Sequence, residues 1–297
     1  MSTTSTGSSS RREPRASIDL AVPTRPEDVR DTLEALGVRP RRAWGQSFLV
    51  DPFIADAEAA LVEARPGRPV VEIGGGLGVL TAALVRRGLE PLTVVEKDVR
   101  LAHFLRVTFG DRIRVIEGDA LTLALPEAVA IVGNLPYAIA TPLLLRLFTL
   151  RAPRLVVLLQ REVAERLAAT PGSKTYGRLT LAARLFGDVE LYRSVPRSAF
   201  VPVPEVDSRL VVHVRRQGPL PVPSLAIYEQ VVRELFSARR KQLGNLLPRL
   251  GGSPAGADRL ARAADWPHDW SRRRPEELPP EAFFALARAL AAERERA

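Results

Sequence analysis

The sequence predicts an α/β protein whose mainly parallel β-sheet carries helices on both faces, followed by a small all-helical C-terminal domain. From residue 69 onward, short runs of β-branched and aliphatic residues alternate with amphipathic helical patterns, which is typical of a doubly wound sheet. The first of these runs, residues 70–73, leads directly into a glycine-rich turn. After a cluster of Gly and Pro at residues 217–223, all remaining patterns are helical.

The N-terminal segment predicts a tail and two helices. Residues 1–24 combine low apolar content with Ser/Thr repetition and then several arginines, so we expect a disordered basic tail, either dispensable or touching RNA phosphate. Residues 26–36 predict a short helix, and residues 51–62 show helical apolar spacing. Between them, a basic cluster at residues 39–42 leads into the segment 44–49.

The remaining elements follow in order along the chain. Strands are predicted at residues 70–73, 92–96, 114–117, 130–133, 155–159, 189–195 and 209–214. The helices between them are predicted at residues 80–87, 101–109, 141–150 and 161–169, and the C-terminal helices at 225–247, 255–264 and 280–292. We therefore expect three parts: a tail of residues 1–24, a sheet domain of residues 25–217, and a helical domain of residues 218–297.

Composition restricts the class of partner. The net charge of +9 favours a polyanion, most simply nucleic acid, although only three of the cations are Lys and an Arg-rich genome composition gives the same charge. The chain has no Cys and three scattered His, so we expect no disulfide and no metal site. It has no apolar run of about 20 residues and no secretory signal, so we expect a cytoplasmic protein, outside the membrane and monomeric.

The tetrapeptide Asn134-Leu135-Pro136-Tyr137 follows the apolar run 130–132, so it is expected at the carboxyl end of a buried strand. An Asn side-chain oxygen beside a proline-constrained carbonyl suits a planar amine with two N–H donors, such as the N6 amine of adenine. Tyr137 supplies a flat face on which a base can stack. Taken alone, the tetrapeptide also fits a simple strand-end turn.

Three further strand ends predict a nucleoside-type cofactor. Residues 74–78 give G-x-G-x-G at a helix start, where bare backbone and the helix end suit a carboxylate or phosphate. Glu96 ends the second strand and can hold ribose hydroxyls, and Asp119 follows the third and can accept an adenine amine. S-adenosylmethionine fits this set, whereas Val79 replaces the third glycine expected for a dinucleotide.

Several longer motifs surround these residues. They are Gly45-Gln46-Ser47-Phe48-Leu49, Gln160-Arg161-Glu162-Val163-Ala164, Tyr176-Gly177-Arg178-Leu179, Phe200-Val201-Pro202-Val203-Pro204, Val206-Asp207-Ser208 and residues 236–246. Through them the chain resembles, from about residue 42 to 290, the small-subunit rRNA adenine N6-dimethyltransferases of the KsgA/RsmA type. The resemblance implies a class I methyltransferase fold, Rossmann-like, and an S-adenosylmethionine cofactor.

The resemblance also implies a substrate and a set of site residues. The substrate is a pair of adjacent adenosines in a hairpin loop near the 3′ end of small-subunit rRNA, each dimethylated at N6 on the maturing subunit. Ser47 stands where the family usually has Asn, and its hydroxyl can still bond the cofactor but with a shorter reach. The cofactor contacts are expected at Ser47, Leu49, Gly74, Gly76, Glu96, Asp119 and Asn134.

The expected chemistry is an amine clamp. The side-chain oxygen of Asn134 and the backbone carbonyl of Leu135 accept the two amine hydrogens, and Pro136 fixes the turn. Tyr137 is expected to stack on one face of a flipped base and Phe200 on the other, unless Phe200 is a core aromatic. RNA contacts are expected outside the pocket, at Arg178, Arg239, Arg240 and Lys241, with the run 272–274 left open.

Three alternatives remain at this stage. The first is a resistance-type methyltransferase that acts on one adenine of large-subunit rRNA, with the same fold and tetrapeptide. The second is a non-catalytic RNA-binding factor in ribosome assembly, which the intact tetrapeptide and glycine turn disfavour. The third is a DNA adenine methyltransferase, which the small helical C-terminal domain disfavours.

Overall fold

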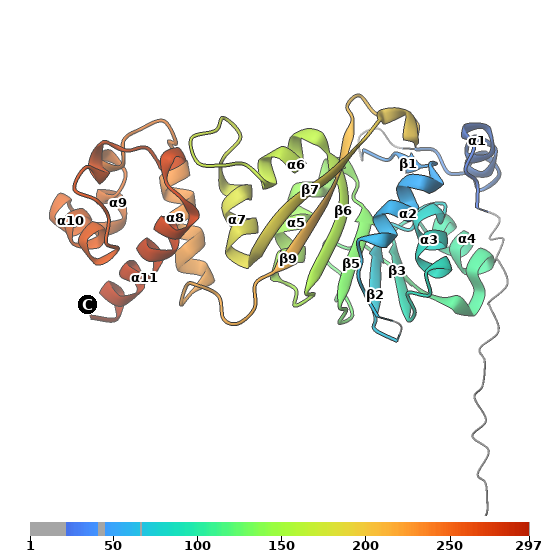
Figure 1. Ribbon diagram of the computed structural model, residues 1–297, viewed down its shortest axis with the longest axis horizontal. Helices are drawn as coiled ribbons and strands as arrows, with labels where there is room; N and C mark the ends of the chain where they lie inside the picture. Colours follow the sequence, from blue (N-terminus) through green and yellow to red (C-terminus); the bar gives the residue numbers. More distant parts are fainter. Residues whose placement is uncertain (1–21, 41–44, 66, 297) are drawn as a thin grey trace, which may run out of the picture.

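The computed structural model describes residues 22–40, 45–65 and 67–296. Most of the predicted tail, and part of the basic cluster at residues 39–42, lie outside the described residues. Figure 1 shows a central sheet with helices on both sides and a group of C-terminal helices at one end. In the part of the chain that is described, no helix is long and apolar enough to cross a bilayer.

The main sheet has seven strands in the order β4-β3-β2-β5-β6-β9-β7. Neighbouring strands from β4 to β6 run parallel, and β9 is antiparallel to both β6 and β7. The bounds are β2 Val70–Ile73, β3 Leu92–Glu96, β4 Ile113–Glu117, β5 Ala130–Asn134, β6 Arg154–Gln160, β7 Gly187–Val195 and β9 Ser208–Arg215. This confirms the predicted fold class and each of the seven predicted strands within about two residues.

A second, two-stranded sheet was not predicted. Its strands are β1 (Phe48–Leu49) and β8 (Phe200–Val201), which pair antiparallel although they are far apart in sequence. Val50 N–H also donates to the Ala199 carbonyl at 2.9 Å, which extends the contact by one residue. This pairing places the segment after Gly45 beside the segment after Phe200.

Helices cover both faces of the sheet, as predicted for a doubly wound fold. One face packs against α2 (Pro52–Ala60), α3 (Val79–Arg86) and α4 (Val99–Phe109). The other packs against α5 (Ala140–Thr149), α6 (Arg161–Leu167) and α7 (Arg178–Phe186). The first helix, α1 (Pro26–Ala35), begins with Pro at its first position and packs beside β8.

The C-terminal elements are helical, but the first is shorter than predicted. The expected helix 225–247 ends at Phe236 as α8 (Leu225–Phe236), so Arg239, Arg240 and Lys241 lie in the turn that follows. The segment after α8 is bonded to a later loop, because the Leu243 N–H donates to the Arg273 carbonyl at 2.8 Å, and Gly244 packs closely on Ser271. The later helices are α9 (Pro248–Gly251), α10 (Pro254–Ala263) and α11 (Pro280–Arg296).

One hydrophobic core runs from the sheet into the C-terminal helices. It includes Val157 of β6, Leu181 of α7, Val231 of α8 and Phe283 of α11 in a single cluster. The hydroxyl of the fully buried Tyr176 donates to the Leu278 carbonyl at 2.8 Å across the same boundary. The helices α8 and α11 therefore contact α7, and Figure 1 shows them on the side of α7 away from the sheet.

Candidate active site

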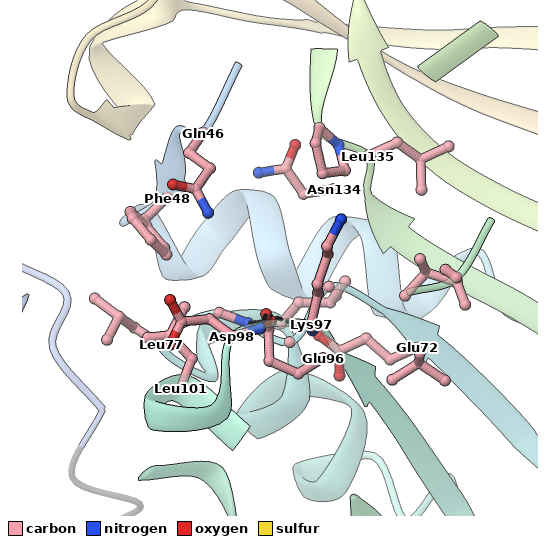
Figure 2. Close-up of a pocket in the computed structure, with 18 of the residues that line it drawn as sticks. Gln46, Phe48, Glu72, Leu77, Glu96, Lys97, Asp98, Leu101, Asn134 and Leu135 are labelled. Carbon is pink, nitrogen blue, oxygen red and sulfur yellow. Dashed lines mark hydrogen bonds between the residues drawn. The ribbon is translucent and has the colours of Figure 1, made fainter. Parts of the chain in front are cut away.

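The chain order reverses between β2 and β5, which are neighbours in the sheet although β3 and β4 lie between them in sequence. Ligands of open α/β sheets bind at such a switch point, beyond the carboxyl ends of the strands. A cavity of about 560 Å³ lies there. In Figure 2, Gln46 and Asn134 lie on one side of it, with Glu96 and Asp98 on the other.

All of the predicted catalytic and cofactor-binding residues except Phe200 line this one cavity. The lining includes Ser47, Leu49, Gly74, Gly76, Glu96, Asp119, Asn134, Leu135, Pro136 and Tyr137. They come from five separate segments of the chain. Four of these segments converge because β2, β3, β4 and β5 run parallel, which brings their carboxyl ends to one edge of the sheet. The fifth, which carries Ser47 and Leu49, belongs to the β1–β8 pair.

The glycine turn after β2 has a backbone that other residues rarely adopt. Gly74, Gly76 and Gly78 have φ values of +79°, +54° and +82°. A Cβ on Gly78 would lie 2.6 Å from the Phe109 ring, and one on Gly75 would lie 2.4 Å from Val94. Gly75 and Gly78 thus allow close packing behind the turn, while Gly74 and Gly76 present bare backbone to the cavity.

Glu96 is held by the backbone at the end of β3. One carboxylate oxygen accepts the N–H groups of Lys97 and Asp98 at 2.8 and 2.9 Å, and the other accepts the Gly76 N–H at 3.0 Å. Burial raises the pKa of Glu96, and these three N–H groups act in the opposite direction. The Gly76 contact ties the acidic residue directly to the glycine turn.

Asp119 lies after β4 and is paired with a cation. Its carboxylate accepts the Leu121 N–H at 2.9 Å and lies 2.8 Å from the ammonium of Lys97. The hydrogen bond from Lys97 is the main cause that lowers the pKa of Asp119. Asp119 is therefore ionised over the whole neutral range, as an acceptor for an amine requires.

Asn134 ends β5 with a defined orientation. Its side-chain Nδ2 donates to the Ser47 backbone carbonyl at 3.2 Å. Since a carbonyl oxygen can only accept, this contact assigns Nδ2 to that side and leaves the Asn134 oxygen free to accept. The Ser47 hydroxyl donates to the Pro202 carbonyl at 2.5 Å, so Ser47 joins two loops of the site.

Tyr137 is fixed at two points. Its hydroxyl lies 2.7 Å from the buried Ser208 hydroxyl, and burial raises its pKa. On the other side, Gly45 approaches so closely that a Cβ there would lie 2.9 Å from the Tyr137 Cβ. Part of the Tyr137 side chain is thus structural, while the residue still lines the cavity. Ser208 belonged to a predicted motif but had no predicted contact.

The expectation that Phe200 stacks on a base is not met in this structure. Its side chain is 0% exposed and belongs to the core cluster below β8, and it is not among the cavity-lining residues. A ring without exposed surface offers no face to a ligand. The core interpretation of Phe200 is the one that the burial supports.

The predicted RNA-contacting residues lie away from the cavity. Arg178 lies at the start of α7, and Arg240 and Lys241 are exposed in the turn after α8. Arg239 is partly buried, 2.6 Å from Glu276, and it donates to the Lys174 carbonyl at 2.9 Å. Its guanidinium therefore links the C-terminal region to the loop before α7.

The cavity suits a charged nucleoside cofactor. Its volume falls in the range of about 300–1,000 Å³ that small-ligand sites occupy. It combines bare glycine backbone, apolar walls and two acidic acceptors, Glu96 and Asp119. In the described ranges, no group of three His, Cys, Asp or Glu side chains is placed to hold a metal ion.

This fold and this site define a class I methyltransferase. A family model described as "Ribosomal RNA adenine dimethylase" matches residues 37–257, which is most of the chain. The chain belongs to this ribosomal RNA adenine dimethylase family. The match includes the glycine turn, the tetrapeptide and the first C-terminal helices.

Curated relatives and solved structures agree with the family. Ribosomal RNA small subunit methyltransferase A of Geobacillus kaustophilus is 36% identical and covers 92% of this chain and 97% of the relative. The protein of the same name from Deinococcus radiodurans is 40% identical, covering 94% and 95%. A dimethyladenosine transferase structure from Plasmodium falciparum has a TM-score of 0.68 at 26% identity, covering 80% and 95%. The 23S rRNA methyltransferase ErmE has a TM-score of 0.63 at 28% identity, covering 82% and 99%.

Proposed function

We propose that this enzyme transfers methyl groups from S-adenosylmethionine to N6 of two adjacent adenosines in a hairpin loop near the 3′ end of small-subunit rRNA. The product is N6,N6-dimethyladenosine on the maturing subunit, in the cytoplasm, and the enzyme acts as a monomer. The observation that carries this proposal is the orientation of Asn134, whose amide nitrogen is bound to Ser47 so that its oxygen is free to accept. The names of the curated relatives support the small subunit as the source of the RNA.

The cofactor would lie along the glycine turn. Gly74, Gly76 and Leu49 would contact it, with Glu96 at the ribose and Asp119 at the adenine. When bound, S-adenosylmethionine supplies a methyl group that is already activated on a sulfonium. The protein therefore needs to orient the acceptor amine, exclude water and hold both partners in line.

The amine is oriented by the tetrapeptide. An adenine amine is a poor nucleophile because its lone pair is delocalised into the ring. The Asn134 oxygen and the Leu135 carbonyl would each accept one amine hydrogen, which favours a more tetrahedral nitrogen with an available lone pair. Pro136 fixes the turn that directs the carbonyl, and Tyr137 stacks on the flipped base. Stacking of this kind contributes roughly 1–3 kcal/mol per base.

RNA affinity would come from cations outside the cavity. Arg240 and Lys241 are exposed, Arg178 lies at the start of α7, and Arg239 holds the adjoining loop. Removing one cation that binds a phosphate should reduce the slope of log affinity against log salt by about one. Arg240→Ala and Lys241→Ala should therefore weaken binding to the small-subunit hairpin RNA and flatten its salt dependence, while binding of S-adenosylmethionine stays unchanged.

The proposed function is tested by methyl transfer from labelled S-adenosylmethionine to unmethylated small subunits, with the modified nucleotides mapped. Asn134→Ala should lower the rate by at least about a hundredfold, as expected when an acceptor that orients a reacting group is removed. It should bind RNA as tightly as wild type. The matched control is Asn245→Ala, because Asn245 is exposed in the C-terminal region. Near-normal turnover by Asn134→Ala would contradict the amine clamp.

A second candidate is methylation of one adenine in large-subunit rRNA. The likeness to the ErmE structure favours it, since 82% of this chain superimposes on 99% of that one. The same assay separates the two, with purified large and small subunits offered in parallel. Label found only in the large subunit would contradict the small subunit as the substrate, but it would not contradict the amine clamp.

A further inference from the structure

Arg100 joins the wall of the cavity to the first helix of the chain. It lies in the first turn of α4 and lines the cavity. Its Nε and Nη2 donate to the Asp98 carboxylate at 3.0 and 2.6 Å. Its Nη1 donates to the backbone carbonyl of Gly37, which lies just beyond the end of α1. One guanidinium thus bonds two segments that are 63 positions apart in the chain.

Asp98 connects Arg100 to the acidic residue proposed to bind the ribose. The Asp98 N–H donates to one oxygen of Glu96 at 2.9 Å, and the other oxygen of Glu96 accepts the Gly76 N–H at 3.0 Å. The side-chain hydrogen bond from Arg100 is also the main cause that lowers the pKa of Asp98. A series of hydrogen bonds therefore runs from the end of α1, through Arg100, Asp98 and Glu96, to the glycine turn.

The apolar side of α1 supports the same wall. Val29 and Leu33 of α1 are buried in one core cluster with Leu77 and Leu101. Leu77 directly follows Gly76, and both Leu77 and Leu101 line the cavity. Figure 2 shows these two leucines beside Asp98. The helix α1 lines no part of the cavity itself, but it shares a core with residues that do.

The contacts of Arg100 differ from those of an ordinary surface ion pair. The Arg100 and Asp98 side chains are 48% and 16% exposed, so their charge interaction alone contributes little to stability. Arg100 binds a second group as well, and the planar fork of a guanidinium can hold two acceptors in a fixed geometry. By contrast, Arg86 pairs with Asp56 at 2.9 Å, and neither residue lines the cavity.

We propose that Arg100 is a positioning residue for the cofactor: it holds α1 against the turn that carries Glu96 and so keeps Glu96 in the orientation that binds the ribose. The inference rests on the proposed use of S-adenosylmethionine. Arg100 acts through Asp98 and Glu96. Because coupling between two sites is reciprocal, a cofactor that binds more tightly when α1 is docked also holds α1 more firmly in place.

The test combines calorimetric titration of the full chain with S-adenosylmethionine and hydrogen exchange of the backbone amides of α1. In the wild type, saturating S-adenosylmethionine should slow exchange in residues 26–36 at least about threefold, although α1 does not line the cavity. Arg100→Met should weaken S-adenosylmethionine binding about fivefold and remove most of this protection. The KM for the cofactor should rise to match, while kcat at saturating cofactor stays within about twofold of wild type.

Arg100→Lys separates the two contacts of the guanidinium. A lysine ammonium can pair with Asp98, but it cannot reproduce the fork that also reaches Gly37. This variant should therefore bind S-adenosylmethionine nearly as weakly as Arg100→Met. Wild-type affinity in Arg100→Lys would show that only the charge beside Asp98 matters, and it would overturn the role of α1. Arg86→Met is the matched control and should change neither binding nor exchange.

A second variant approaches the same coupling from α1. Leu33→Ala removes a buried side chain of α1 without touching the cavity, and it should also weaken S-adenosylmethionine binding while RNA affinity stays unchanged. Unchanged cofactor affinity in Arg100→Met, or weaker binding with the exchange of α1 unaltered, would overturn the positioning role. Both results would leave the proposed function standing. A wild type that fails to bind S-adenosylmethionine would refute both.

Discussion

The ammonium of Lys97 lies 2.8 Å from the carboxylate of Asp119, and both residues line the cavity. Lys97 follows Glu96 directly, so one strand end supplies both the predicted ribose acceptor and the partner of the predicted adenine acceptor. The side chains are 57% and 28% exposed, so the pair is worth at most about 1 kcal/mol to stability. Its effect is instead on the ionisation of Asp119.

The Asp119 carboxylate should be required for cofactor affinity. Asp119→Ala should weaken binding of S-adenosylmethionine about tenfold or more, since a hydrogen bond to a charged acceptor is removed. Lys97→Met should weaken cofactor binding only at acidic pH. Lys97 lowers the pKa of Asp119, so without it the carboxylate takes a proton at a higher pH and affinity falls earlier as the pH drops. Calorimetric titrations at pH 7 and at pH values down to about 4, near the ordinary pKa of an Asp, measure both effects, and identical acid profiles of Lys97→Met and wild type would contradict the second.

Gly45 should be needed to keep Tyr137 in place. An added Cβ would lie 2.9 Å from both the Tyr137 Cβ and the Ala138 nitrogen, so Gly45→Ala must displace the tetrapeptide. We expect methyl transfer to fall at least about tenfold, as for other small displacements of reacting groups. Gly218→Ala is the matched control, because Gly218 has a similar positive φ of +80° with nothing within 4 Å. Equal decreases in activity in the two variants would show that backbone strain alone is responsible.

The hydroxyl pair of Tyr137 and Ser208 should contribute to stability more than to catalysis. Tyr137→Phe leaves the buried Ser208 hydroxyl without its partner, at a cost of about 1–3 kcal/mol in the free energy of unfolding. The ring remains for stacking, so methyl transfer should fall by less than about tenfold. Urea unfolding of Tyr137→Phe, Ser208→Ala and the double variant gives the coupling energy. A coupling near zero would mean that the two hydroxyls do not interact in solution.

Stability should fall as the pH rises, because of Glu58. Burial raises the pKa of Glu58 in the folded state, so Glu58 keeps its proton there at pH values at which the unfolded chain has already released it. The free energy of unfolding therefore decreases as the pH rises above the ordinary pKa of a Glu. Glu58→Gln should flatten the slope by up to about 1.4 kcal/mol per pH unit at pH values above the ordinary pKa of a Glu. The measurement is urea unfolding at three pH values, with Asp56→Asn as control. Parallel curves for wild type and Glu58→Gln would mean that Glu58 is ionised in the fold.

The sequence predicted the strands of the main sheet well because β2, β5 and β6 are buried on both faces and are nearly continuous apolar runs. It did not predict β1 and β8, because a strand of two residues is too short to show the alternation of apolar and polar residues. The pairing also joins positions about 150 residues apart in the chain. The helix α7 was missed as well. The predicted helix 225–247 was too long, because apolar residues continue past Phe236 into a turn that tertiary contacts impose.

The site was predictable where a motif carries its own chemistry. The glycine turn, Glu96, Asp119 and the tetrapeptide lie at strand ends, and the parallel order alone brings them together. A motif does not show whether a side chain is buried. The sequence therefore did not reveal that Phe200 lies in the core and not in the cavity. Glu58 gave no signal, since an acidic residue at a helical position is expected to face solvent. The hydrogen bond from Ser47 to Pro202 depends on the pairing of β1 with β8. Because that pairing was not predicted, this contact was not predicted either.

The core that joins the sheet to the C-terminal helices has a geometric consequence. Because α7, α8 and α11 share it, the turn that carries the exposed Arg240 and Lys241 is attached to the same core as the sheet that carries Asn134. If Arg240 and Lys241 bind RNA phosphate as proposed, the distance between them and Asn134 would select which nucleotide reaches the cavity.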